Sequence, residues 1–136
     1  MVADSEVLKI TTNQQSFFYE YLLLKKPILE MILSRINGKK VKLSPKILKV
    51  FSYLLYYNFT YQSLDDKEKW NKVFSDESKS VIMESIGINQ YHLNTYLSIL
   101  RNIKILTGKS ISKPFLIYPG KVFNLIFEFN FNGNEK

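Results

Sequence analysis

The stretch that decides the fold lies between residues 78 and 106 and reads SKSVIMESIGINQYHLNTYLSILRNIKIL. It predicts two short helices hinged at Gly87, because glycine adopts the positive φ of a tight bend without a steric cost. Asn89 is placed to cap the second helix by accepting a hydrogen bond from an N–H of its first turn. Apolar residues at helical spacing predict one buried stripe on each helix. They are Val81, Ile82 and Ile86 in the first helix and Leu93, Tyr96, Leu97 and Leu100 in the second.

The other face of the second helix is polar. Its outward residues are Gln90, Tyr91, Asn94, Thr95, Ser98 and Arg101. Uncharged donors and acceptors with one arginine are the side chains that read base edges. A helix, a tight turn and a second helix of this size place the second helix in a DNA major groove. We therefore expect a recognition helix over residues 89–103, with these six residues as DNA-binding candidates.

Four features of this stretch resemble the winged helix-turn-helix superfamily. They are the Gly87-Ile88 step, the polar start of the second helix, the Tyr96-Leu97-x-x-Leu100-Arg101 pattern and the Ile105-Leu106 step into a strand. In the family a glycine often precedes that final apolar pair, whereas this chain has Lys104. The resemblance covers residues 41–131 and implies an α+β fold with three helices and a C-terminal β-hairpin wing. Many winged helices bind protein rather than nucleic acid, so the resemblance implies two classes of function.

The expected winged domain spans residues 39–131, and the polar tail at 132–136 is expected to fray. Its first helix begins at Ser44-Pro45, where the hydroxyl caps the helix and proline occupies a position whose N–H needs no partner. The inward residues of that helix are Ile47, Leu48, Phe51, Leu54 and Leu55. We expect it to reach Tyr57.

The remaining elements of the domain are a charged connection and the wing. Residues 59–76 predict a loop with a short helix around Trp70, whose indole we interpret as a packing anchor. Two β-rich runs separated by Pro119-Gly120 predict the strands of the wing, at 115–121 and 122–131. The segment 115–120 is faintly similar to the wing of plasmid and phage replication proteins.

Residues 1–38 precede the domain and predict an extension with a short strand at 6–12 and a helix that starts at Pro27. The stretch 16–24 is apolar and does not decide between strand and helix. The helix over 27–37 carries an apolar stripe made of Ile28, Leu29, Ile32, Leu33 and Ile36. That stripe needs a partner surface, and two alternatives remain open: packing on its own domain or pairing with a second copy in a homodimer.

The net charge of +7 is carried by residues after position 38. One basic cluster consists of Lys39, Lys40, Lys42, Lys46 and Lys49. A second lies between Glu84 and Glu128, where no acid occurs, and consists of Arg101, Lys104, Lys109, Lys113 and Lys121. A basic face beside a helix-turn-helix is expected for phosphate contact, so we assign that role to Lys104, Lys109 and Lys113. The alternative is that the lysines only keep the surface soluble.

Several classes of protein are disfavoured. The chain has no cysteine and a single histidine, His92, so thiolate and histidine metal clusters and disulfides are not expected. The Thr107-Gly108-Lys109-Ser110 run lacks the upstream glycine of a phosphate-binding loop, where Ile103 stands instead. We expect no enzyme, no cofactor and no metal. No apolar run approaches the roughly 20 residues that span a bilayer, and residues 1–6 lack the character of a signal peptide.

The favoured hypothesis is a DNA-binding winged-helix protein, either a transcription regulator or a replication-initiator-like factor, acting on double-stranded DNA in the cytoplasm with the nucleoid. The alternative is a small structural or assembly protein, for instance a virion component, that uses the fold for protein–protein contacts. Salt-dependent binding to duplex DNA separates the two, because contact with phosphates releases counterions.

Overall fold

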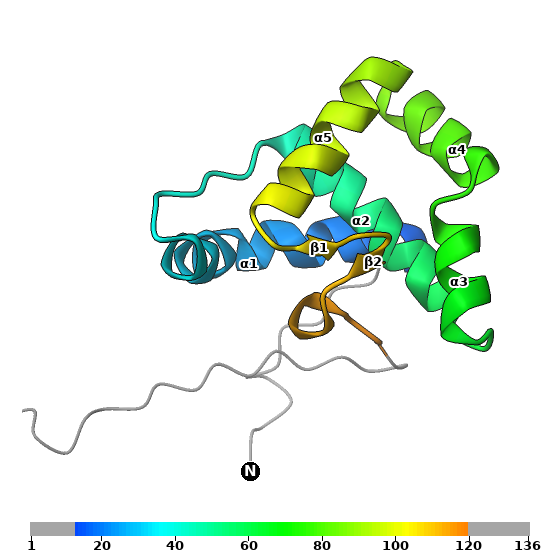
Figure 1. The fold of residues 1–136 in the computed structure, drawn as a ribbon, viewed down its shortest axis with the longest axis horizontal. Helices are drawn as coiled ribbons and strands as arrows, with labels where there is room; N and C mark the ends of the chain where they lie inside the picture. The colour runs from blue at the N-terminus through cyan, green and yellow to red at the C-terminus, as the bar shows by residue number, and fades with distance from the viewer. Residues whose placement is uncertain (1–12, 120–136) are drawn as a thin grey trace, which may run out of the picture.

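The computed structural model describes residues 13–119. Within them the chain forms five α-helices, a two-stranded antiparallel sheet and a short 3-10 helix (Figure 1). The helices are α1 (Gln14–Asn37), α2 (Pro45–Thr60), α3 (Asp66–Val73), α4 (Asp76–Ile86) and α5 (Gln90–Asn102). They are followed by β1 (Leu106–Thr107), β2 (Ser110–Ile111) and the 3-10 helix η2 (Lys113–Phe115).

Each of the five helices begins at a polar side chain that caps it. The caps accept a hydrogen bond from the backbone N–H three residues on, and they are Asn13, Ser44, Asp65, Ser75 and Asn89. Such a cap contributes about 1 kcal/mol by satisfying a donor that the helix leaves without a partner. The sequence prediction of caps at Ser44 and Asn89 is confirmed.

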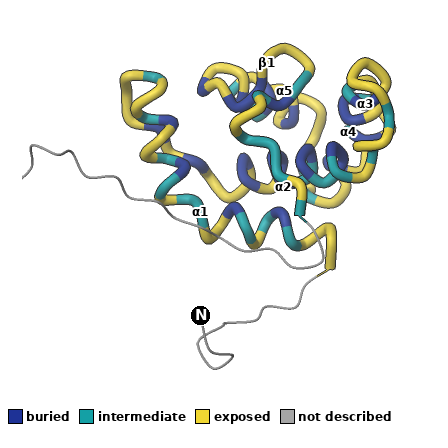
Figure 2. The backbone as a smooth tube through the Cα atoms, turned by 90° about the horizontal axis from the view of Figure 1, so that it is seen from below, coloured by how far each residue is buried: buried dark blue, intermediate teal, exposed yellow. Residues whose placement is uncertain are grey.

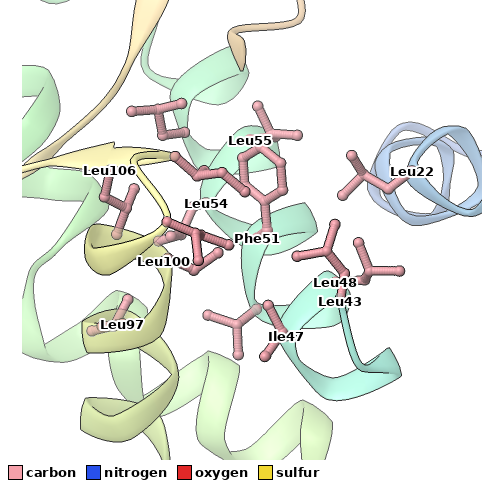
Figure 3. Packing of buried hydrophobic residues seen from close by; sticks show 14 of the residues in the cluster. Leu22, Leu43, Ile47, Leu48, Phe51, Leu54, Leu55, Leu97, Leu100 and Leu106 are labelled. Carbon is pink, nitrogen blue, oxygen red and sulfur yellow. The ribbon is translucent and has the colours of Figure 1, made fainter. Parts of the chain in front are cut away.

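The central element is α2, which packs against each of the other four helices. Its expected inward residues are all buried: Ile47, Leu48, Phe51, Leu54 and Leu55. In Figure 3 the side chains of α2 lie between Leu22 of α1 on one side and Leu97 and Leu100 of α5 on the other. The core is therefore shared by α1, α2 and α5, and the helix continues to Thr60, one turn beyond the expected end.

The N-terminal region differs from the prediction, because α1 begins at Gln14 and contains Pro27 in its interior. An interior proline removes one helical hydrogen bond and costs about 3 kcal/mol. Burial of a large apolar side chain returns about 1.5–3 kcal/mol, and both Phe18 and Leu22, before the proline, are buried. The packing on α2 therefore keeps one helix on both sides of Pro27. Its two halves run in different directions, and buried and exposed stretches alternate along it (Figures 1 and 2).

The prediction of an α+β winged helix-turn-helix fold, with three helices, a C-terminal hairpin wing and a strand/helix extension, is wrong. The described chain has five helices, and its β-structure is confined to the hairpin between Leu106 and Ile111. Residues 115–119 form no strand, because Pro114 lies in the turn of η2 and Pro119 has no N–H to donate. The expected strand at 6–12, the wing after 119 and the tail at 132–136 lie outside the described residues.

The expected short helix around Trp70 is present as α3. Trp70 is half-buried against the core, and its ring centroid lies 6.4 Å from that of Phe74. The Nζ of Lys69 lies 4.4 Å from the centroid of the indole ring. Trp70 is thus a packing residue, as the sequence indicated.

Candidate nucleic-acid interface

The helix-turn-helix predicted from residues 78–106 is present as α4, a tight turn and α5. Gly87 adopts a φ of 76°, and its N–H donates to the carbonyl oxygen of Met83 at 2.9 Å. The N–H of Ile88 donates to the same oxygen at 3.0 Å, and Asn89 then caps α5. A Cβ at Gly87 would meet no atom within 4 Å. Glycine is therefore required here by the left-handed backbone and not by lack of space.

The apolar faces of the two helices follow the prediction in part. Leu93, Leu97 and Leu100 of α5 are buried, and so is Ile82 of α4. Val81 is 43% exposed, so its expected inward position is wrong. The inward residues of α4 are Ser78 and Ile82, which are four positions apart. Val81 is one position before Ile82, so its side chain is rotated by about 100° round the helix from that inward direction.

All six expected polar residues of α5 are exposed: Gln90, Tyr91, Asn94, Thr95, Ser98 and Arg101. Two of them are joined by a hydrogen bond, which Gln90 Nε2 donates to Asn94 Oδ1 at 3.0 Å. The hydroxyl of Thr95 donates to the carbonyl oxygen of Tyr91 at 3.0 Å. The Gln90–Asn94 bond restricts both side chains. The carbonyl oxygen of Gln90 and the amide nitrogen of Asn94 take no part in it, and amide groups of this kind suit hydrogen bonding to a base edge.

The candidate site has four cations, Arg101 on the polar face of α5 and Lys104, Lys109 and Lys113 after the helix, and all are exposed. Among the described residues none of them lies within 4.0 Å of a carboxylate, since the salt bridge found there joins Lys69 and Asp66. Lys109 lies in the turn of the hairpin between β1 and β2. The Nε of Arg101 donates to the carbonyl oxygen of Gly108 at 3.0 Å, which brings the last turn of α5 and the hairpin turn together.

The chain leaves α5 through a left-handed residue, Lys104, whose φ is 73°. The N–H of Lys104 donates to the carbonyl oxygen of Arg101, and that of Ile105 donates to Leu100, each at 3.0 Å. These two bonds form a Schellman motif, with Ile105 and Leu100 both fully buried beside it. A non-glycine residue in this conformation costs roughly 1–2 kcal/mol.

One side chain that the sequence did not single out joins α1 to this site. The amide nitrogen of Asn37 donates to the carbonyl oxygen of Leu33 at 2.8 Å and to that of Ile103 at 3.0 Å. Asn37 and Ile103 are 66 residues apart, and no local pattern pairs them. The bond places the end of α1, and the basic residues that follow it, at the end of α5.

Among residues 13–119, the carboxylates outside α1 lie away from this end of α5. They gather at the starts of α3 and α4, and they are Asp65, Asp66, Glu68, Asp76 and Glu77, with Glu84 further along α4. Figure 1 shows α3 on the opposite side of the molecule from the connection between α1 and α2. Within residues 13–119 no group of histidine, aspartate and glutamate side chains is arranged to hold a metal ion.

One ionisable group in the core has a displaced pKa. Burial, followed by the charges of its neighbours, raises the pKa of Tyr57 to about 12. The neighbours are Tyr53, Tyr61, Tyr56 and Glu77. Tyr57 is a buried residue of α2 and not part of the polar face of α5, so we expect its protonation to affect the stability of the fold.

Comparison with protein families, with curated proteins and with solved structures found no match to this chain. None of the helices among residues 13–119 combines the length and the apolar character needed to cross a membrane.

Proposed function

We propose that this chain is a DNA-binding protein that inserts α5 into the major groove of duplex DNA, as a transcription regulator or a replication-initiator-like factor. The observation that carries the proposal is the division of α5 into two faces. One face buries Leu93, Leu97 and Leu100, and the other exposes six polar side chains with no carboxylate among them. Such a face suits hydrogen bonds to bases and attraction to phosphates.

The proposed roles follow from position and chemistry. Gln90 and Asn94 are joined side by side in the first turns of α5 and read bases, since amides form paired hydrogen bonds with adenine. Tyr91, Thr95 and Ser98 contribute further contacts along the same face. Arg101 is held at the hairpin by its Nε, and its terminal nitrogens contact guanine or phosphate. Lys104, Lys109 and Lys113 contact phosphates.

The direct test is a titration of the whole protein into labelled duplex DNA of random sequence, at several salt concentrations, followed by selection of preferred sites from the pool. We expect log K to fall linearly with log salt, with a slope of about 0.9 per phosphate contacted. We also expect one sequence motif to be enriched. Binding that is absent at low salt, or that is indifferent to salt and sequence, would overturn the proposal.

A second candidate function, assembly through protein–protein contacts, rests on the exposed apolar side chains of α1. Leu29 and Leu33 of the predicted stripe pack in the core of their own domain. Five large apolar side chains of α1 nevertheless remain 40–57% exposed: Leu23, Leu24, Met31, Ile32 and Ile36. Exposed apolar side chains that gather into one patch mark protein–protein interaction sites. A second copy of the chain, or another protein of an assembly such as a virion, is a suitable occupant.

Light scattering of the whole protein at tens of micromolar tests this second candidate. We expect the mass of a dimer for the natural chain and of a monomer for Met31→Lys combined with Ile36→Lys. Val81→Lys is the matched control, because Val81 is an apolar residue of similar exposure on α4. A monomeric natural chain would reject self-association through α1. Removal of α1 would be uninformative, since Phe18 and Leu22 belong to the core.

A further inference from the structure

The connection between α1 and α2 is extended, and its backbone is held in place. The N–H of Val41 donates to the hydroxyl oxygen of Ser34 at 2.9 Å, and the N–H of Leu43 donates to a carboxylate oxygen of Glu30 at 2.6 Å. Val41 and Leu43 are buried, at 5% and 2% exposure. In an extended chain alternate side chains point to opposite sides, so Lys40 and Lys42 are exposed.

This connection lies beside the C-terminal end of α5. The hydrogen bond from Asn37, the last residue of α1, to the carbonyl oxygen of Ile103 joins the start of the connection to the end of α5. Lys39 is two residues after Asn37, and Lys104 is one residue after Ile103. Figure 1 shows the connection next to the C-terminal half of α5, and α2, which follows it, packs against α5. Lysines that are distant in the sequence therefore flank one end of the same helix.

The charge around this junction is predominantly positive. No acid occurs between Glu30 and Asp65 or between Glu84 and Glu128 in the sequence. Glu30 itself accepts the hydrogen bond from Leu43. Lys49 is set apart from the group, because its Nζ lies 5.7 Å from the ring centroid of Tyr19. Lys39, Lys40 and Lys42 thus form an exposed basic strip whose anchored backbone limits the entropy lost when an anion binds.

We infer that this basic strip, Lys39, Lys40 and Lys42, binds the phosphate backbone of duplex DNA beside the groove that α5 occupies. The inference rests on the proposed function, because it extends the same interface with DNA. The strip contributes affinity and orientation and reads no sequence, since contacts with phosphates carry no base information. Together with Lys104 it holds the C-terminal end of α5 against the backbone.

The test compares three variants of the whole protein with the natural chain, on the same random-sequence duplex and over the same range of salt. Lys40→Gln with Lys42→Gln removes two charges of the basic strip. Lys67→Gln with Lys72→Gln is the matched control, because both lysines are exposed on α3. Gln90→Ala with Asn94→Ala alters the proposed reading face alone. The readouts are the slope of log K against log salt and the preferred site from selection.

We expect the Lys40 and Lys42 variant to lower the slope by about two units, at about 0.9 per phosphate, with the preferred site unchanged. The α3 control should keep the slope of the natural chain. An unchanged slope in the Lys40 and Lys42 variant, or an equal loss in the control, would overturn the basic strip while leaving the role of α5 intact. Two results together would overturn the role of α5 and support the strip: a lowered slope in the Lys40 and Lys42 variant and an unaltered site preference in the Gln90 and Asn94 variant. Failure of the natural chain to bind DNA would overturn both.

Discussion

Arg101 Nε donates a hydrogen bond to the carbonyl oxygen of Gly108 at 3.0 Å, and this bond joins the last turn of α5 to the turn of the β1–β2 hairpin. Gly108 has a φ of 60°, a conformation that favours glycine and is common in two-residue hairpin turns. The same arginine carries a positive charge next to Lys109 in that turn. The Arg101 side chain therefore both stabilises the hairpin turn and presents a positive charge to a ligand.

Arg101→Lys keeps the charge but loses the planar guanidinium group and its Nε donor. We expect the salt dependence of DNA binding to stay close to that of the natural chain while the affinity falls. Arg101→Gln should lower both. In either variant the amides of the hairpin should exchange faster with solvent, as NMR can measure. Hairpin exchange that is unchanged in both variants would show that the bond to Gly108 does not stabilise the turn.

Gln90→Ala with Asn94→Ala should weaken sequence discrimination by about 1–3 kcal/mol for the base that they contact. Both residues are exposed, and the hydrogen bond between them contributes only about 0.2–0.5 kcal/mol to the helix, so the melting temperature should change little. Competition between the selected site and random duplex measures the discrimination. Gln62→Ala with Asn71→Ala, two exposed residues outside α5, is the control. Equal discrimination in both double variants would reject α5 as the reading helix.

Lys104→Gly should change stability and binding in opposite directions. Glycine adopts the φ of 73° without strain, so we expect a gain of about 1 kcal/mol in the free energy of unfolding. Loss of one phosphate contact should lower the salt slope by about one unit. Lys104→Ala separates the two effects, because it removes the charge and keeps the strain. Chemical denaturation and DNA titration provide the measurements, and a glycine variant that is less stable than the natural chain would contradict the strain.

Leu97→Ala should destabilise the protein by about 2–5 kcal/mol, because it leaves a cavity where α5 packs on α2. Val81→Ala should cost less than about 0.5 kcal/mol, since Val81 is on the surface. Thermal and urea unfolding measure both. Similar losses for the two variants would mean that the register of α4 or α5 differs from the one described.

Tyr57 makes stability depend on pH in the alkaline range. Its pKa is raised from 10.0 to about 12 in the folded chain, so between these values the unfolded chain has released the proton and the folded chain retains it. Its contribution is thus complete below pH 10 and is lost as the pH rises to about 12. As the pH rises from 10 to about 12, we expect the free energy of unfolding to fall less for Tyr57→Phe than for the natural chain. Tyr91→Phe, at an exposed site, should follow the natural chain, and identical curves for both variants would argue against the shift.

The features that the sequence predicted correctly depend on near neighbours. Gly87 and Asn89 define the turn and the start of α5 through bonds to residues at most five positions away. The exposed face of α5 and the inward face of α2 follow from helical periodicity, which acts over a few turns. The predicted inward position of Val81 is wrong because the apolar pattern of α4 allows more than one inward direction. Packing on α2 decides which of these directions is buried.

The sequence by itself thus determined the helix-turn-helix, its caps and its polar and apolar faces, because short-range hydrogen bonds and periodicity are sufficient for these. The tertiary structure decided that one helix passes through Pro27, since the burial of Phe18 and Leu22 on α2 offsets the hydrogen bond that the proline removes. It also decided that residues 115–119 form no strand and that the end of α1 lies at the end of α5. These outcomes depend on contacts between residues far apart in the chain, and a local sequence pattern does not predict the free energies of such contacts.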